Sequence, residues 1–127
     1  MTVRVADPDD HLAVMRLLDA AMLEANAAAV EARIEAGDVL VAVEEGRVLG
    51  AAVLEPLDDG VFLRSIAVRR ARRGNGIGTA LVDRATRRHG RLTAEFDERV
   101  RPFYASMDFE MERLSDDRFR GSTGDDL

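Results

Sequence analysis

The N-terminal part of the chain combines two hydrophobic periods. Residues 2–6, TVRVA, alternate apolar and polar side chains, which predicts a half-buried strand. Asp7 and Pro8 then have the residue types of a helix N-cap and a first helical position. Apolar residues follow at helical spacing, at Leu12, Met15, Leu18 and Met22. We therefore expect a strand followed by a helix that buries this stripe.

A second helix is expected over residues 27–36. Asn26 is a suitable N-cap, Val30 and Ile34 are the inward positions, and Gly37 ends the helix.

From residue 39 the period changes to that of strands. Residues 39–56 predict two strands joined at the turn EEGR, with Pro56 ending the second strand. A further turn at residues 58–60, DDG, precedes a third strand over residues 61–68, VFLRSIAV. Three consecutive strands joined by short turns indicate an antiparallel meander.

The C-terminal half alternates helices and strands. Residues 76–89 predict a helix that Gly90 closes, and its apolar side consists of Ile77, Leu81, Val82 and Ala85. The segments RLTAEF and DFEMERL predict strands on either side of a short helix, RVRPFYASM, and DDRFRG can add a short edge strand. From Ser115 the composition becomes polar and acidic, so residues 115–127 are expected to be a mobile acidic tail.

The predicted element order, βααβββαβαβ, defines the fold class. The helix over residues 76–89 is a crossover and should make its flanking strands parallel. The prediction is an α/β fold in which a mixed, mostly antiparallel sheet with a central parallel pair has helices on both faces. A chain of 127 residues favours one domain, over residues 1–127.

Composition excludes several chemistries. The chain has no cysteine and no lysine, so all 18 basic residues are arginines. Disulfides, thiolate metal sites, Schiff bases and a P-loop lysine are therefore excluded, and no metal-ligand spacing such as HExxH is present. A net charge of -6 argues against nucleic-acid binding. With no signal-peptide pattern and no membrane-spanning run, a cytoplasmic protein without membrane partners is expected.

Positive charge nevertheless gathers at residues 68–79, VRRARRGNGIGT. A strand ends there, glycines occupy positions 74, 76 and 78, and a helix begins. The first N–H groups of a helix have no intrahelical partner, and glycines let an anion approach the backbone closely. The arrangement predicts a cradle for a polyphosphate. Two alternatives remain open, a solvated arginine loop and a nucleic-acid patch, whereas the Rossmann pattern GxGxxG fails at Thr79 and Leu81.

The same residues resemble motif A of the GNAT-type N-acetyltransferases, R/Q-x-x-G-x-G/A, which falls on Arg73, Gly76 and Gly78. The element order is also similar to that of the family, so the resemblance covers nearly the whole chain. It implies acetyl-CoA as the acetyl donor, with the pyrophosphate held by the loop and the pantetheine arm by the preceding strand. The cofactor-binding residues so implied are Ile66, Ala67, Val68, Arg73, Gly74, Asn75, Gly76, Ile77, Gly78 and Thr79.

A second segment, RPFYASMDFEM, resembles the family's "fYeklGFe" sequence. The resemblance implies that Tyr104, the only tyrosine, stands beside the thioester sulfur as the general acid. This chain departs from the family at three positions: Asp108 replaces a glycine, Asp97 stands near a frequent asparagine, and Arg70 replaces a frequent proline.

The implied reaction transfers an acetyl group to a primary amine, which must first lose a proton. Glu95 is the candidate base, and Asp97, Glu55 and a water relay remain alternatives. The acceptor is expected to be a small molecule or a peptide, and similar proteins commonly form homodimers. A non-catalytic acyl-CoA-binding module is the alternative function, and a nucleic-acid binder using the arginine loop is a third.

Overall fold

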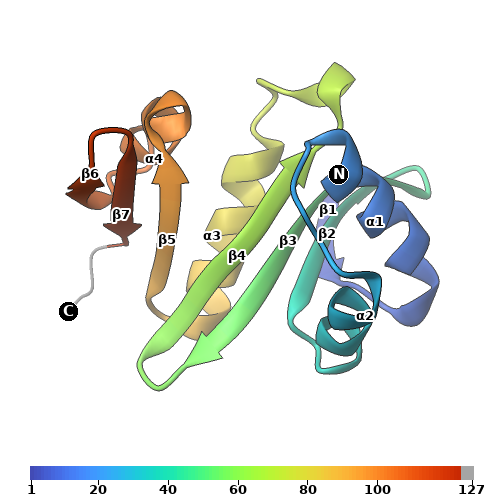
Figure 1. Cartoon of the computed structure of the whole chain (residues 1–127). Helices are drawn as coiled ribbons and strands as arrows, with labels where there is room; N and C mark the ends of the chain where they lie inside the picture. Colours follow the sequence, from blue (N-terminus) through green and yellow to red (C-terminus); the bar gives the residue numbers. More distant parts are fainter. Residues whose placement is uncertain (124–127) are drawn as a thin grey trace.

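The apolar pattern folds into one seven-stranded sheet in the computed structural model, which describes residues 1–123 (Figure 1). The strands are β1 (Thr2–Val5), β2 (Val39–Glu44), β3 (Arg47–Leu57), β4 (Gly60–Val68), β5 (Leu92–Asp97), β6 (Glu110–Ser115) and β7 (Arg118–Ser122). The α-helices are α1 (His11–Ala20), α2 (Ala27–Glu35), α3 (Ile77–His89) and α4 (Arg101–Ala105). Short 3-10 turns occupy Pro8–Asp10, Arg70–Arg72 and Glu98–Val100.

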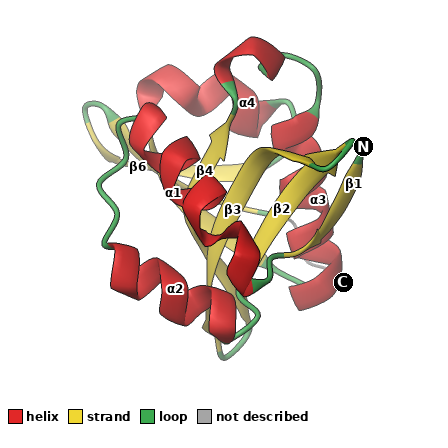
Figure 2. Cartoon of the chain, turned by 90° about the vertical axis from the view of Figure 1, so that its right-hand side faces the viewer, coloured by secondary structure: helices red, strands yellow, loops and turns green. Residues whose placement is uncertain are grey.

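The sheet has the order β1-β2-β3-β4-β5-β7-β6, and β4 and β5 are its parallel pair. The other neighbouring strands are antiparallel. α3 and α4 contribute to the core on one face of the sheet, and α1 and α2 to the core on the other. Figure 2 shows this layering, with α1 and α2 in front of the strands and α3 behind them. The predicted fold class is confirmed.

Local signals place most element ends correctly. The Asp7 carboxylate accepts a hydrogen bond from the N–H of Asp9, and the Asn26 side chain accepts one from Ala29, each at 2.9 Å. Glu45 and Gly46 form the two-residue turn between β2 and β3 with φ of 52° and 79°, which is the tight hairpin turn that matches strand twist. No helix within residues 1–123 is long and apolar enough to cross a membrane.

The buried face of α1 differs from the predicted stripe. Leu18 is buried as expected, but Leu12 is 60% exposed and Met22 is 90% exposed. The buried positions are Val14, Leu17 and Leu18, at i, i+3 and i+4 spacing. The helix also ends at Ala20, and Met22 lies beyond it with φ of 60°. The prediction failed at Met22 because the turn after α1 carries apolar residues that continue the helical spacing, and at Leu12 because the sheet beneath α1 decides which of its residues are buried.

The prediction that Pro56 ends its strand is wrong, since β3 continues to Leu57 and Pro56 pairs with Val61 of β4. The N–H of Leu54 donates to the carbonyl of Asp38 on the β2 side at 2.8 Å. The backbone nitrogen of Pro56, two residues after Leu54, faces the same side of β3. It lies past Val39, the residue at which β2 begins, so no strand within residues 1–123 stands opposite it. Its missing N–H therefore removes no ladder hydrogen bond.

The mobile tail predicted over residues 115–127 is wrong for residues 118–122, which form β7. β7 is also an interior strand, because it pairs with β5 on one side and with β6 on the other. Phe119 fixes β7 to the core, because its side chain is only 5% exposed. The guanidinium groups of Arg101 and Arg113 lie 5.1 and 4.7 Å from the centroid of the Phe119 ring. The part of the predicted tail at 124–127 lies outside the described residues.

Candidate functional site

A cleft opens where the two parallel strands separate. β4 and β5 pair only over 61–63 and 92–94, and beyond these residues the strands diverge (Figure 1). The opening forms a cleft of about 780 Å³, which is within the range of small-molecule sites. Because β5 no longer pairs with residues 64–68, the N–H and C=O groups of β4 that face this side have no strand partner. They are available to hydrogen-bond an extended ligand.

A β-bulge in β4 lies at the point of divergence. Leu63 pairs with Leu54 and Ser65 pairs with Val53, so Arg64 is the extra residue. A bulge interrupts the alternation of side chains between the two faces. Leu63 therefore belongs to the core beneath α3, whereas Arg64 and Ser65 both line a second cleft on the α1 and α2 face.

The glycine turn presents a row of N–H groups without partners. The N–H of Arg73 donates to the carbonyl of Arg70 at 3.3 Å, and the helical ladder begins where Ala80 donates to Gly76 at 3.0 Å. Between them, the N–H groups of residues 74–79 donate no hydrogen bond to any acceptor within residues 1–123. Such a row at a helix start is a ready-made anion site.

Glycine is required in this turn for its backbone conformation and for the open space beside it. Gly74 and Gly76 have φ of 81° and 82°, where a side chain is disfavoured, and no atom lies within 4 Å of a Cβ built on either residue. Gly78 differs, because its Cβ would lie 3.1 Å from the ring of Phe103. Gly78 thus permits α4 to pack closely against the first turn of α3.

Two arginines of the turn are held by this chain's own groups. The Nε of Arg73 donates to the carbonyl of Val68 at 3.2 Å, and Arg72 forms an ion pair with Glu44 at 3.0 Å. Arg73 therefore ties the turn to the end of β4 while still lining the cleft.

Tyr104 closes the inner end of the cleft. The residue is 4% exposed, and its ring stacks on Phe96 with the centroids 4.0 Å apart. Phe103 and Phe109 contact the ring edge-on, at 4.9 and 5.2 Å. Burial raises the pKa of the Tyr104 hydroxyl to about 12. The hydroxyl therefore keeps its proton at neutral pH, and complete loss of that proton is about 3 kcal/mol harder than from a free phenol.

The three candidate carboxylates have different surroundings. Glu95 lines the cleft and accepts hydrogen bonds from Arg120 at 3.1 and 3.3 Å. Asp97 also lines the cleft, but the backbone N–H and the side chain of Arg99 donate to it, and these bonds hold its pKa below the usual value. Glu55 lies away from this cleft and lines the second one.

The second cleft lies between α2 and the sheet and has a volume of about 520 Å³. Its polar lining consists of Glu24, Asn26, Arg33, Glu55, Arg64 and Ser65. Arg64 and Ser65 line both clefts. The bulge of β4 is therefore the boundary that the two clefts share.

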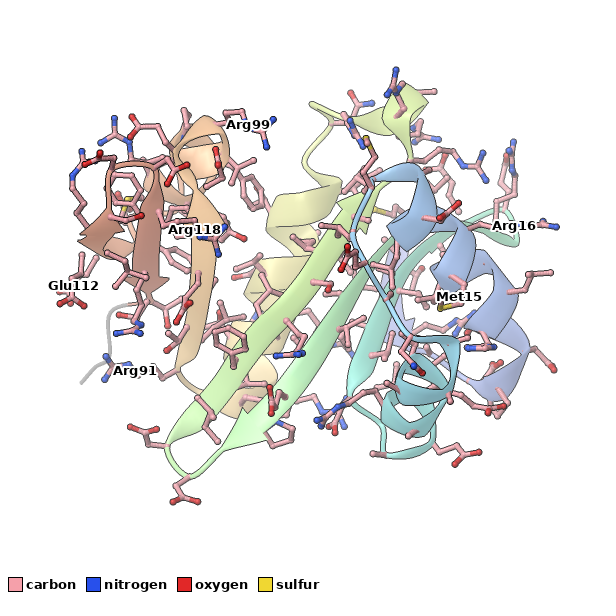
Figure 3. All side chains as sticks on the ribbon, in the orientation of Figure 1. Met15, Arg16, Arg91, Arg99, Glu112 and Arg118 are labelled. Atoms are coloured by element: carbon pink, nitrogen blue, oxygen red, sulfur yellow. The ribbon has the colours of Figure 1, made fainter. Side chains whose placement is uncertain are left out.

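Of the predicted site residues, the structure brings all but Asn75 to the lining of the first cleft. Sequence reasoning missed Arg64, Ser65, Arg99 and Arg118, which also line it. Figure 3 shows Arg99 and Arg118 beside α4 and β5. A bulge has no clear sequence signal, and Arg118 lies in the segment DDRFRG, for which the sequence allows either a mobile tail or a short edge strand. The histidines line neither cleft, and His11 instead contacts the carbonyl of Ala27 at 2.9 Å.

Comparison with known proteins places this geometry in a family. A family model for the acetyltransferase (GNAT) domain matches residues 35–111. The Mycobacterium tuberculosis protein Rv2747, solved in complex with CoA, is 26% identical, with a TM-score of 0.77 over 91% of this chain and 75% of that one. No curated protein matches the sequence significantly.

Two further solved structures are similar in fold. Ard1 from Thermoplasma volcanium is 18% identical, with a TM-score of 0.81 over 96% of this chain and 95% of that one. YncA, a putative acetyltransferase from Salmonella typhimurium solved with acetyl-CoA, is 23% identical, with a TM-score of 0.76 over 97% and 92%.

Proposed function

Because the chain belongs to the GNAT acetyltransferase family, we propose that it transfers the acetyl group of acetyl-CoA to the primary amine of a small molecule or peptide. The observation that carries this proposal is the row of unpartnered N–H groups at residues 74–79, which opens into a cleft long enough to reach Tyr104.

The residues of the cleft fit a CoA-type cosubstrate. The N–H groups of residues 74–79 and the open space at Gly74 and Gly76 suit a diphosphate. The edge of β4 at 66–68 has no strand partner among the described residues, and only the carbonyl of Val68 accepts a hydrogen bond there, from Arg73. This edge suits the amide groups of a pantetheine arm, which can pair with it as a strand would. The thioester would then lie near the divergence of β4 and β5, where Tyr104 lines the cleft.

The transfer forms one bond and breaks one. The ammonium form of the acceptor first loses one proton, its nitrogen then bonds to the acetyl carbon and loses a second proton, and the carbon–sulfur bond breaks to release a thiolate that takes up a proton. A backbone N–H of β4 can stabilise the charge that develops on the carbonyl oxygen, an effect worth about 3 kcal/mol for one good donor. The products are an acetylated amine and CoA.

Acid and base lie on opposite faces of the sheet. On the α3 face of the sheet, the ring of Phe96 stacks on the ring of Tyr104, and both residues belong to the same core. Side chains alternate along a strand, so Glu95 points to the other face. We therefore assign protonation of the thiolate to Tyr104, and to Glu95 the acceptance of a proton from an amine that approaches from the α1 and α2 side. Both groups line the same cleft.

Replacing Glu95 with glutamine should lower kcat/KM for the amine about 100-fold, because general-base catalysis of this kind contributes a factor of 10² to 10⁴. Steady-state kinetics at saturating acetyl-CoA measures the effect. Glu112→Gln is the matched control, since Glu112 also pairs with Arg120, at 3.7 Å, but lies outside the cleft. Equal activity of Glu95→Gln and wild type would exclude Glu95 and leave Asp97, Glu55 or a water relay as the proton acceptor.

The function itself is tested by incubating the protein with acetyl-CoA and a panel of amines while free thiol and acetylated product are both measured. Binding is measured beside turnover. Acetyl-CoA at 100 times its dissociation constant should raise the free energy of unfolding by about 2.7 kcal/mol. Binding with no acetylated product from any amine would instead favour a non-catalytic acyl-CoA-binding module.

A further inference from the structure

The second cleft contains two arginines whose ion pairs are too long to be hydrogen bonds. Arg33 lies 3.7 Å from Asp38 and 3.8 Å from Glu55, and Arg64 lies 3.7 Å from the other oxygen of Glu55. No side-chain hydrogen bond of Arg33 or Arg64 is formed within residues 1–123. Both guanidinium groups thus form ion pairs but no hydrogen bonds, so their N–H donors can still hydrogen-bond a ligand.

The two arginines reach this cleft from different elements. Arg33 extends from α2, and its side chain is 36% exposed. Arg64 is the bulged residue of β4, and its side chain is 63% exposed. The bulge brings Arg64 and Ser65 to the same face, next to the place where the two clefts meet. A ligand bound by both arginines would thus lie beside the point of acetyl transfer.

We propose that the acceptor is a small amine that also carries a carboxylate, such as an α-amino acid, and that Arg33 and Arg64 bind this carboxylate. This inference rests on the proposed function. Guanidinium groups present paired donors that match the two oxygens of a carboxylate. Arg33 and Arg64 are therefore residues that determine acceptor specificity.

The charged residues of the second cleft favour an acceptor that has both a positive and a negative group. The lining of this cleft carries two arginines and two glutamates, Glu24 and Glu55. Both arginines would repel a purely cationic acceptor, such as a polyamine, and both glutamates would repel a purely anionic one. A molecule with one ammonium and one carboxylate complements both signs. The cleft, at about 520 Å³, also fits a ligand of small-molecule size.

The test compares each of a panel of α-amino acids with its carboxamide, which keeps the amine and side chain and removes the negative charge. For the best amino acid, wild type should show kcat/KM at least 10-fold above that of the amide. In Arg64→Gln this ratio should fall close to 1 through KM for the amino acid. A preference for the acid cannot arise from amine protonation, because the amide has the less basic amine.

Arg16→Gln is the control, since Arg16 lies on the outer side of α1 and lines neither cleft (Figure 3). It should keep the wild-type ratio. Arg33→Gln should act as Arg64→Gln does, and Arg33→Lys should restore part of the preference. Because Arg33 pairs with the buried Asp38, its variants are compared only if their melting temperatures match wild type.

The measurements distinguish an error in the carboxylate site from an error in the proposed acetyltransferase function. Equal acetylation of acids and amides in wild type, or an unchanged ratio in Arg64→Gln, overturns the carboxylate site and leaves the acetyltransferase function standing. If no amine is acetylated, the thermal shift caused by the same amino acids in the presence of CoA is measured. A shift that Arg64→Gln abolishes supports the carboxylate site without the function, and no shift overturns both.

Discussion

Replacing Gly76 with aspartate is expected to weaken CoA binding at least 100-fold while leaving the protein folded. Gly76 has φ of 82° and no atom within 4 Å of its Cβ position, so the new carboxylate has room and lies where the diphosphate is proposed to bind. Two like charges about 5 Å apart repel by about 3 kcal/mol at an effective dielectric constant of about 20. That energy corresponds to a factor of more than 100 in affinity, which calorimetric titration with CoA measures.

Gly46→Asp is the matched control for this variant. Gly46 has nearly the same backbone conformation, with φ of 79°, and nothing lies within 4 Å of its Cβ position. It sits in the turn between β2 and β3, outside the lining of either cleft. Both variants should lose a similar, small amount of stability, because aspartate tolerates the left-handed region. Equal affinity of the two variants for CoA would contradict the proposed cradle.

Replacing Tyr104 with phenylalanine is expected to lower kcat about 100-fold with an unchanged dissociation constant for CoA. The hydroxyl is the proposed proton donor to the departing thiolate, and a positioned general acid contributes a factor of 10² to 10⁴. The ring contacts with Phe96, Phe103 and Phe109 persist in the variant, so the melting temperature should stay close to that of wild type. Single-turnover kinetics, calorimetric titration and thermal unfolding measure the three quantities.

The pH dependence of wild type gives an independent check on Tyr104. A phenol acts as an acid only below its pKa, and burial raises the pKa of Tyr104 to about 12. Ionisation of Tyr104 should therefore cause no loss of kcat between pH 7 and pH 10. A full-rate Tyr104→Phe variant would remove the residue from the mechanism.

Most elements of the fold can be predicted from the sequence because the residues that start, end or turn them are adjacent in the chain. Caps at Asp7 and Asn26 and the turn at Gly46 depend only on adjacent residues, and the structure confirms them. Asp108 is a further case, because it stands where the family has glycine and adopts φ of 61°, as a glycine would. Aspartate is one of the few residues that tolerate this conformation.

The parts of the fold that sequence reasoning misplaced depend on distant contacts. β7 is short and polar outside Phe119, and it becomes an interior strand only because β5 and β6 offer it two free edges. Leu12 and Met22 fit the helical spacing of α1, yet which residues of α1 are buried is decided by the sheet beneath it. Tertiary packing overrides local pattern in both cases.

One part of the candidate site can be predicted from adjacent residues, and the other part cannot. The glycine turn was predictable because a strand end, glycines and a helix start are adjacent in sequence. The bulge at Arg64 was not, because it arises from the register between β3 and β4. The second cleft likewise combines α2 with two strands, so its pair of arginines appears only in three dimensions.

Amide proton–nitrogen spectra of the labelled protein can show whether the N–H groups of residues 74–79 hold the diphosphate of CoA. Addition of CoA should shift the signals of residues 74–79, whereas pantetheine, which lacks the diphosphate, should shift those of 66–68 alone. If CoA binds and the signals of 74–79 stay in place, the phosphate site lies elsewhere and the account is contradicted.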